Sequence, residues 1–185
     1  IAALLGACEN DPGPAGARDA AIIAILYAAG LRRDEIVSLD LEDYNQESGR
    51  LLVRGKRNKQ RTSYLLNGAS RALDDWLDVR GMDPGPLFMP INRGGSIQTR
   101  RMTAQAIYNV LLVRAGEAGV SDFSPHDLRR TFISDLLDAG ADIAIVAKMA
   151  GHANVQTTAR YDRRPEEAKM QAAQRLHVPY HGRKK

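Results

Sequence analysis

Two histidines, an arginine and a tyrosine in the C-terminal half of the chain have the types and spacing for chemistry on a phosphodiester. His126 and Arg129 are at positions i and i+3 in SPHDLRRTF, His152 lies in AGHANVQ, and Tyr161 ends ANVQTTARY. Residues at i and i+3 of a helix share a face, so both side chains can reach one ligand. The first turn of a helix favours anions, and arginine matches phosphate oxygens with a planar fork. The pattern predicts a phosphate site leading to a tyrosine nucleophile.

Of the six tyrosines, Tyr161 is the one bracketed by basic residues, with Arg160 before it and Arg163 and Arg164 after it. Neighbouring cations favour the phenolate over the phenol, which helps a tyrosine to act as a covalent nucleophile. Taken alone, however, each residue has a simpler interpretation. Tyr161 fits a tyrosine that anchors a helix end, His152 an ordinary loop histidine, and Arg129 an arginine in a surface ion pair.

Basic residues upstream offer further contacts to a polyanion. Arg32 and Arg33 follow a helix stop in AAGLRRDEI, and GKRNKQR places Lys56 and Lys59 in a predicted β-turn. Such runs are usually solvated, yet a lysine on a turn beside DNA can reach a groove or a leaving oxygen. A metal site is disfavoured, because the sequence has one cysteine, no HExxH motif and no close pair of ligands.

The elements that must position these residues are mainly helical. Apolar spacing and capping residues predict an α+β domain with one small antiparallel sheet, formed by a hairpin between 44 and 66. We expect 11–17 to be a loop and 87–89 a brief strand. Helices are expected near 1–10, 18–30, 31–41 (opened by Asp34), 69–81, 103–118, 124–140, after Asp142, after Asn154, and over 165–177.

Composition fits one soluble globular domain with a basic balance. The 185 residues are 44% apolar and 26% charged, and the net charge of +4 suits a polyanionic partner. A single cysteine favours a reducing compartment, and neither a membrane span nor a signal peptide is visible. Because IAALLGACEN resembles the end of a helix and no initiator Met precedes it, we expect the chain to be a fragment.

Four motifs together resemble the catalytic domain of the tyrosine site-specific recombinases, the phage integrase and Xer-like family. They are AAGLRRDEIVSLDLEDY, VRGKRNKQR, HDLRRTF and AGHANVQTTARY, within a resemblance from about Ala3 to His177. Glu35 matches a supporting acid, and the lysine motif points to Lys56 rather than Lys59. The resemblance implies six catalytic residues: Arg32, Lys56, His126, Arg129, His152 and Tyr161. Further DNA contacts are expected from Arg33, Arg57, Lys59, Arg61, Arg130 and Arg160.

The resemblance also implies a mechanism that needs no cofactor, metal or ATP. Tyr161 would attack phosphorus to give a 3′-phosphotyrosyl link, while Arg32, Arg129 and His152 hold the non-bridging oxygens. Lys56 would protonate the departing 5′-hydroxyl, and His126 would assist proton transfer near the nucleophile. Because the covalent link conserves the bond energy, religation would need no further energy source.

Partners and organisation follow from the same resemblance. We expect double-stranded DNA with a specific recombination site, and a homo-tetramer, or a hetero-tetramer with a related recombinase, assembled through the C-terminal helix. The expected location is the bacterial or phage cytoplasm at the nucleoid, with no membrane partner. The catalytic domain would span 1–177, followed by a basic mobile tail over 178–185. The family's N-terminal core-binding domain is not in this sequence, which puts independent tight DNA binding in question.

Alternatives remain open on the sequence alone. Type IB topoisomerases share the chemistry but relax supercoils as monomers, and the apolar face of the last helix fits either a neighbouring subunit or its own core. A catalytically silent DNA-binding relative is disfavoured because all six catalytic positions are filled. A metal-dependent nuclease is disfavoured by the ligand spacing. The small departure at Ala150, before Gly-His, concerns packing more than chemistry.

Overall fold

The structure is a computed structural model that describes residues 1–55, 60–121, 123–164 and 167–182. It is mainly helical with a small antiparallel sheet in the order β1-β2-β3, which confirms the predicted fold class. The strands are β1 (Tyr44–Asn45), β2 (Arg50–Arg54) and β3 (Gln60–Tyr64). The helices are α1 (Ala2–Glu9), α2 (Pro14–Ala28), α3 (Arg33–Val37), the 3-10 turn η1 (Leu41–Asp43), α4 (Gly68–Arg80), α5 (Ala104–Glu117), α6 (Pro125–Asp138), α7 (Ile143–Ala150), α8 (Val155–Ala159) and α9 (Glu167–Gln174).

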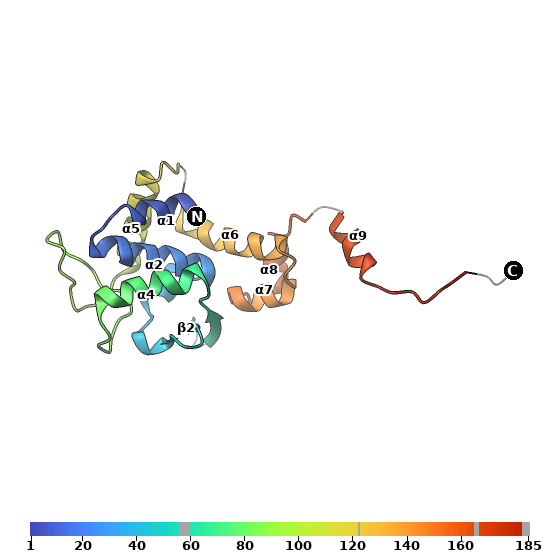
Figure 1. Ribbon diagram of the computed structural model, residues 1–185, viewed down its shortest axis with the longest axis horizontal. Coiled ribbons are helices and arrows are strands. Elements are labelled where there is room, and N and C mark those ends of the chain that lie inside the picture. The colour runs from blue at the N-terminus through green and yellow to red at the C-terminus, as the bar shows by residue number, and fades with distance from the viewer. Residues whose placement is uncertain (56–59, 122, 165–166, 183–185) are drawn as a thin grey trace.

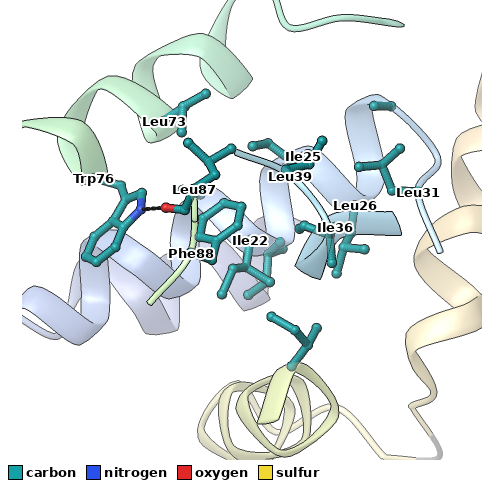
Figure 2. Close-up of a cluster of buried hydrophobic side chains, with 14 of the residues drawn as sticks. Ile22, Ile25, Leu26, Leu31, Ile36, Leu39, Leu73, Trp76, Leu87 and Phe88 are labelled. Atoms are coloured by element: carbon teal, nitrogen blue, oxygen red, sulfur yellow. Dashed lines mark hydrogen bonds between the residues drawn. The ribbon is translucent and has the colours of Figure 1, made fainter. Parts of the chain in front are cut away.

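Helix α2 forms the centre of the main core, because its AAIIAIL run is apolar on most sides. Ile22, Ile25 and Leu26 are almost fully buried, and Figure 2 shows Ile22 close to Phe88 and Leu26 close to Ile36 of α3. Trp76 of α4 packs in this core, and its indole Nε1 donates a hydrogen bond of 2.8 Å to the carbonyl oxygen of Leu87. This core supports the turn between α2 and α3.

A second apolar cluster joins α6 to α7. Phe132, Ile133 and Leu137 of α6 are buried against Val146 and Ala150 of α7. Figure 1 shows α6, α7 and α8 to one side of α1, α2 and α4. The small Ala150 side chain is fully buried at this contact, which agrees with the expectation that this position affects packing.

The predicted hairpin is confirmed for its strands. In the antiparallel register Arg54 pairs with Gln60 and Val53 with Arg61, and Val53 faces the core. The turn between them, which contains Lys56, Arg57 and Lys59, lies outside the described residues.

Expectations about several individual elements were wrong. Helix α2 begins at Pro14, because proline suits the first helical turn, so the expected loop over 11–17 ends early. Helix α3 is capped by Arg32 rather than opened by Asp34, since the Glu35 carboxylate binds the backbone N–H of Arg32. The predicted strand at 87–89 is absent. The backbone there makes isolated hydrogen bonds instead, such as the one from the N–H of Leu87 to the carbonyl oxygen of Leu39. Strand β1 was not predicted, because two residues carry no periodicity.

The C-terminal segment extends away from the rest of the chain (Figure 1). Helix α9 ends at Gln174, before the predicted end at His177. Large apolar side chains on this segment are exposed: Met170, Leu176, Val178 and Tyr180. Among the helices described, none combines the length and apolar character needed to cross a bilayer.

Candidate active site

Arg32 is fixed at the start of α3 by one buried carboxylate. Its backbone N–H donates to Oε2 of Glu35 at 2.8 Å, and its Nη1 donates to Oε1 of the same residue at 3.0 Å. The Glu35 side chain is only 6% exposed, whereas that of Arg32 is 47% exposed. Glu35 therefore orients the guanidinium of Arg32 through one hydrogen bond, while about half of the Arg32 side chain stays exposed.

Arg129 lies beneath the site, on α6. It is buried, and its guanidinium donates to the carbonyl oxygens of Gly30, in the α2–α3 turn, and Ala150, at the end of α7. Burial and the nearby Arg32 lower the pKa of Arg129 to about 10, so it stays a cation at neutral pH. Gly30 has φ +57, and a Cβ built there would lie 2.4 Å from the Phe132 ring. Because Gly30 has no side chain, the turn can lie close to α6, where its carbonyl oxygen accepts the hydrogen bond from Arg129.

His126, Arg32 and Arg129 line one pocket of about 390 Å³, the arginine pocket, which Arg33 also lines. His126 is in the first turn of α6, where Asp127 accepts hydrogen bonds from the backbone N–H and hydroxyl of Ser124. The structure therefore brings His126, Arg129 and Arg32, three of the residues proposed from the sequence, together in one pocket. A helix N-terminus beside two guanidinium groups favours an anion.

His152 follows the left-handed C-cap Gly151 of α7. Its Nδ1 lies 2.8 Å from Oγ1 of Thr158, which is fully buried. Burial, followed by the positive charges of Arg129 and Arg32, lowers the pKa of His152 to about 4. The imidazole is therefore neutral at pH 7, and a Thr158 hydroxyl that donates to Nδ1 would leave Nε2 as the proton donor.

Tyr161 follows α8 and is half-buried against the α6–α7 cluster. It lines a hollow of about 370 Å³ with residues from α6, among them Arg130 and Thr131, and with Arg163. None of the residues lining this hollow lines the arginine pocket. Tyr161 therefore does not line the arginine pocket.

Among the residues that the structure describes, the arginines expected to contact DNA differ in exposure: three are exposed, whereas Arg61 is largely buried. Arg33 is exposed, with its guanidinium 5.2 Å from the centre of the Tyr108 ring. Arg130 and Arg160 are exposed; Arg130 has its Nη1 3.5 Å from the Asp127 carboxylate.

Arg61 is largely buried between the sheet and two helices. It donates to both carboxylate oxygens of Glu35 and to the Met149 carbonyl. This burial follows from the strand register, because Arg61 faces the same side of the sheet as its buried partner Val53, and the sequence alone did not indicate that register. Nor did any sequence signal mark Thr158 as the partner of His152.

A larger hollow of about 760 Å³ lies between α1, α2 and α4. Glu9, Asp11 and Asp75 line it, so its charge opposes binding of a phosphate. Within the described part of the chain, no three His, Cys, Asp or Glu residues converge in a way that could hold a metal ion.

The chain matches the model of the phage integrase family over residues 1–167. It is 36% identical over 156 residues to tyrosine recombinase XerC of Herpetosiphon aurantiacus, covering 80% of this chain and 49% of that relative. It is 37% identical over 167 residues to tyrosine recombinase XerD of Mycobacterium leprae, covering 85% of this chain and 51% of that protein. The chain thus spans about half the length of the curated relatives it matches.

Solved structures agree with the sequence matches. The crystal structure of XerA recombinase superposes with a TM-score of 0.74 at 26% identity, covering 96% of this chain and 63% of that one. XerH site-specific recombinase in a post-cleavage complex with its difH substrate gives a TM-score of 0.71 at 25% identity, covering 92% and 49%. Because the family match takes in every described catalytic candidate from Arg32 to Tyr161, the chain belongs to the phage integrase family.

Proposed function

We propose that this chain is the catalytic domain of a site-specific DNA recombinase that cuts and rejoins strands through a 3′-phosphotyrosyl intermediate. The observation that carries the proposal is the pocket in which Arg32, His126 and Arg129 meet. Arg129 also binds the Ala150 carbonyl, two residues before His152, and Tyr161 lines a hollow on the same helix, α6. The named XerC and XerD relatives are tyrosine recombinases, and this favours recombination over topoisomerase-like relaxation.

The chemistry assigns charge stabilisation to Arg32, Arg129 and His152. Two guanidinium groups neutralise the non-bridging oxygens of the scissile phosphate, and neutral His152 adds a hydrogen bond without adding charge. Arg129 already has fixed carbonyl partners on two elements, so it needs little reorganisation when DNA binds. Preorganised donors of this kind account for most of the rate enhancement in such sites.

Tyr161 supplies the nucleophile in this proposal. Its hydroxyl attacks phosphorus, the P–O bond to the 5′-oxygen breaks, and the new ester joins Tyr161 to the 3′ end. Lys56 donates the proton to the departing 5′-oxygen, and His126 assists transfer of the tyrosine proton. Because Tyr161 lines the neighbouring hollow, its side chain must turn toward the arginine pocket when DNA is bound.

Assembly is proposed to use the C-terminal segment. Helix α9 and the residues after it extend from the domain and expose Met170, Leu176 and Val178. Apolar side chains on an extended segment gain most by packing on a second copy of the domain. We propose that four copies on DNA exchange these segments, as a homo-tetramer or with a related recombinase.

The test is capture of the covalent intermediate. A library of nicked duplexes with a randomised central segment is incubated with the protein in EDTA, and protein-linked DNA is recovered and sequenced. The expected result is a Tyr161-linked adduct on an enriched sequence, and none with Tyr161→Phe. A control variant, Arg50→Gln at the exposed first residue of β2, should form the adduct at the wild-type rate. An adduct that persists in Tyr161→Phe, or a strict requirement for a divalent metal, would contradict the mechanism.

A further inference from the structure

We propose that Arg61 is a positioning residue for phosphate binding: by sharing the Glu35 carboxylate, it keeps the guanidinium of Arg32 free to bind the scissile phosphate. This inference rests on the proposed function and deepens it, because it assigns Arg61 a role other than direct contact with DNA. Arg61 lies on β3, directly after the hairpin turn, and its side chain is 13% exposed.

The first support is the way in which Glu35 divides its oxygens between two arginines. Nη1 of Arg61 donates to Oε1 at 3.0 Å, and Nη2 donates to Oε2 at 2.8 Å. Arg32 uses the same two oxygens differently, with one backbone N–H and one side-chain nitrogen. Arg61 therefore makes the paired, fork-shaped contact, and Arg32 makes a single side-chain contact.

This division has a consequence for charge. A bidentate arginine–carboxylate pair is the strongest arrangement available to either partner. If Arg61 were absent, the buried Glu35 would lack its main counter-charge, and Arg32 would be drawn into the vacant fork. Arg32, which lines the arginine pocket and makes one side-chain hydrogen bond to Glu35, would then be drawn away from that pocket.

The second support is the contact of Arg61 with the end of α7. Its Nε donates to the Met149 carbonyl oxygen at 2.9 Å, directly before the Ala150 carbonyl that Arg129 binds. A Cβ built on Gly151 would lie 3.2 Å from Nη1 of Arg61, so the guanidinium lies against this backbone. Arg61 and Arg129 thus bind the consecutive carbonyl oxygens of Met149 and Ala150. Because His152 follows two residues later, these contacts connect strand β3 to a second residue that we propose binds phosphate.

The experiment compares two substrates that differ in charge at one phosphate. The duplex recovered by adduct capture is synthesised with a phosphodiester or with an uncharged methylphosphonate at the scissile position. Rates of adduct formation are measured for wild type, Arg61→Gln, Arg61→Lys and Arg32→Gln. The methylphosphonate has one fewer anionic oxygen, so an arginine that acts on that charge matters less for its cleavage.

The expected result is a substrate-dependent defect. Arg61→Gln should slow phosphodiester cleavage by roughly 10- to 100-fold, the usual effect of losing a group that orients a ligand. On the methylphosphonate its rate relative to wild type should recover, as it should for Arg32→Gln. Arg61→Lys should be intermediate, because lysine keeps the charge and lacks the fork.

The matched control is Arg54→Gln, which removes a similar ion pair on the neighbouring strand. Arg54 binds the buried Asp43 at 2.5 Å, away from the pocket residues. A purely structural loss should slow both substrates by the same factor, as expected for this variant. If Arg61→Gln behaves like Arg54→Gln, the positioning role is overturned, whereas failure of the wild type to form any adduct overturns the proposed function instead.

A crystal structure of Arg61→Gln decides the inference independently of DNA cleavage. Arg32 is expected to turn and make a two-bond contact with Glu35. An Arg32 side chain in its present position, with one bond to Glu35, would overturn the proposal.

Discussion

Arg129 and Ala150 are joined by a hydrogen bond from a buried guanidinium to a backbone carbonyl at the end of α7. The same guanidinium binds the Gly30 carbonyl, directly before Leu31 and Arg32. One side chain therefore fixes the backbone next to Arg32 and His152, the two other residues that we propose bind the scissile phosphate. In the proposed mechanism, Arg129 therefore both supports the backbone of the site and binds the phosphate.

Replacement of Arg129 should consequently affect both catalysis and stability. Arg129→Ala is expected to slow adduct formation by about 10²–10³ and to leave two buried carbonyls without a donor, at about 1–3 kcal/mol each. Arg129→Lys should retain part of the stability and lose most of the rate, because lysine lacks the fork. Cleavage rates and urea unfolding check this, and a normal rate in Arg129→Ala would mean that the site is misplaced.

His152 should make stability depend on pH in the acidic range. Its folded pKa of about 4 is below the ordinary value of 6.5, so the unfolded chain takes up a proton first as pH falls. The contribution of His152 is thus fully present above pH 6.5 and is lost between 6.5 and 4. Unfolding midpoints of wild type and His152→Asn, measured across this window, should converge as the pH falls. Parallel pH profiles would refute the assigned burial.

Tyr27 should report on the attachment of α6 to the main body. Its hydroxyl donates to Asp135 at 2.7 Å, and this contact, with burial, raises the pKa of Tyr27 to about 12. Tyr27→Phe should cost about 1 kcal/mol of unfolding free energy and remove one late-titrating phenol from an ultraviolet titration. Asp135→Asn should lower the pKa of Tyr27 toward 10, its ordinary value. No change in that variant would contradict the hydrogen bond.

Removal of residues 165–185 should separate assembly from chemistry. The truncated chain retains Tyr161 and the pocket, so the domain should keep its unfolding midpoint and still form an adduct on a nicked duplex. On DNA, however, it should stay at one copy per site, measured by sedimentation with the recovered duplex. Wild-type assembly by the truncated chain would rule out the C-terminal segment as the proposed contact.

The sequence predicted residue types and helices better than it predicted partners. The six catalytic positions could be proposed from motifs, and the helix at Ser124–Asp127 from its capping signals, because these depend on neighbours in the chain. The hydrogen bonds that Arg61 and Arg32 both donate to Glu35 depend on strand register and on contacts between segments that are distant in the sequence. Tyr161 lining a hollow apart from the arginines is likewise a matter of packing, which spacing along the chain does not encode.

Gly30 gives the arrangement of the two arginines a narrow tolerance. Its carbonyl receives Arg129, the ring of Phe132 occupies the place of its missing side chain, and Arg32 follows two positions later. A methyl group at Gly30 would overlap the ring of Phe132 on α6, so that ring would have to move from its present position against the turn that precedes Arg32. The distance between the guanidinium groups of Arg32 and Arg129, and with it the size of the anion that both can bind, therefore depends on glycine at position 30.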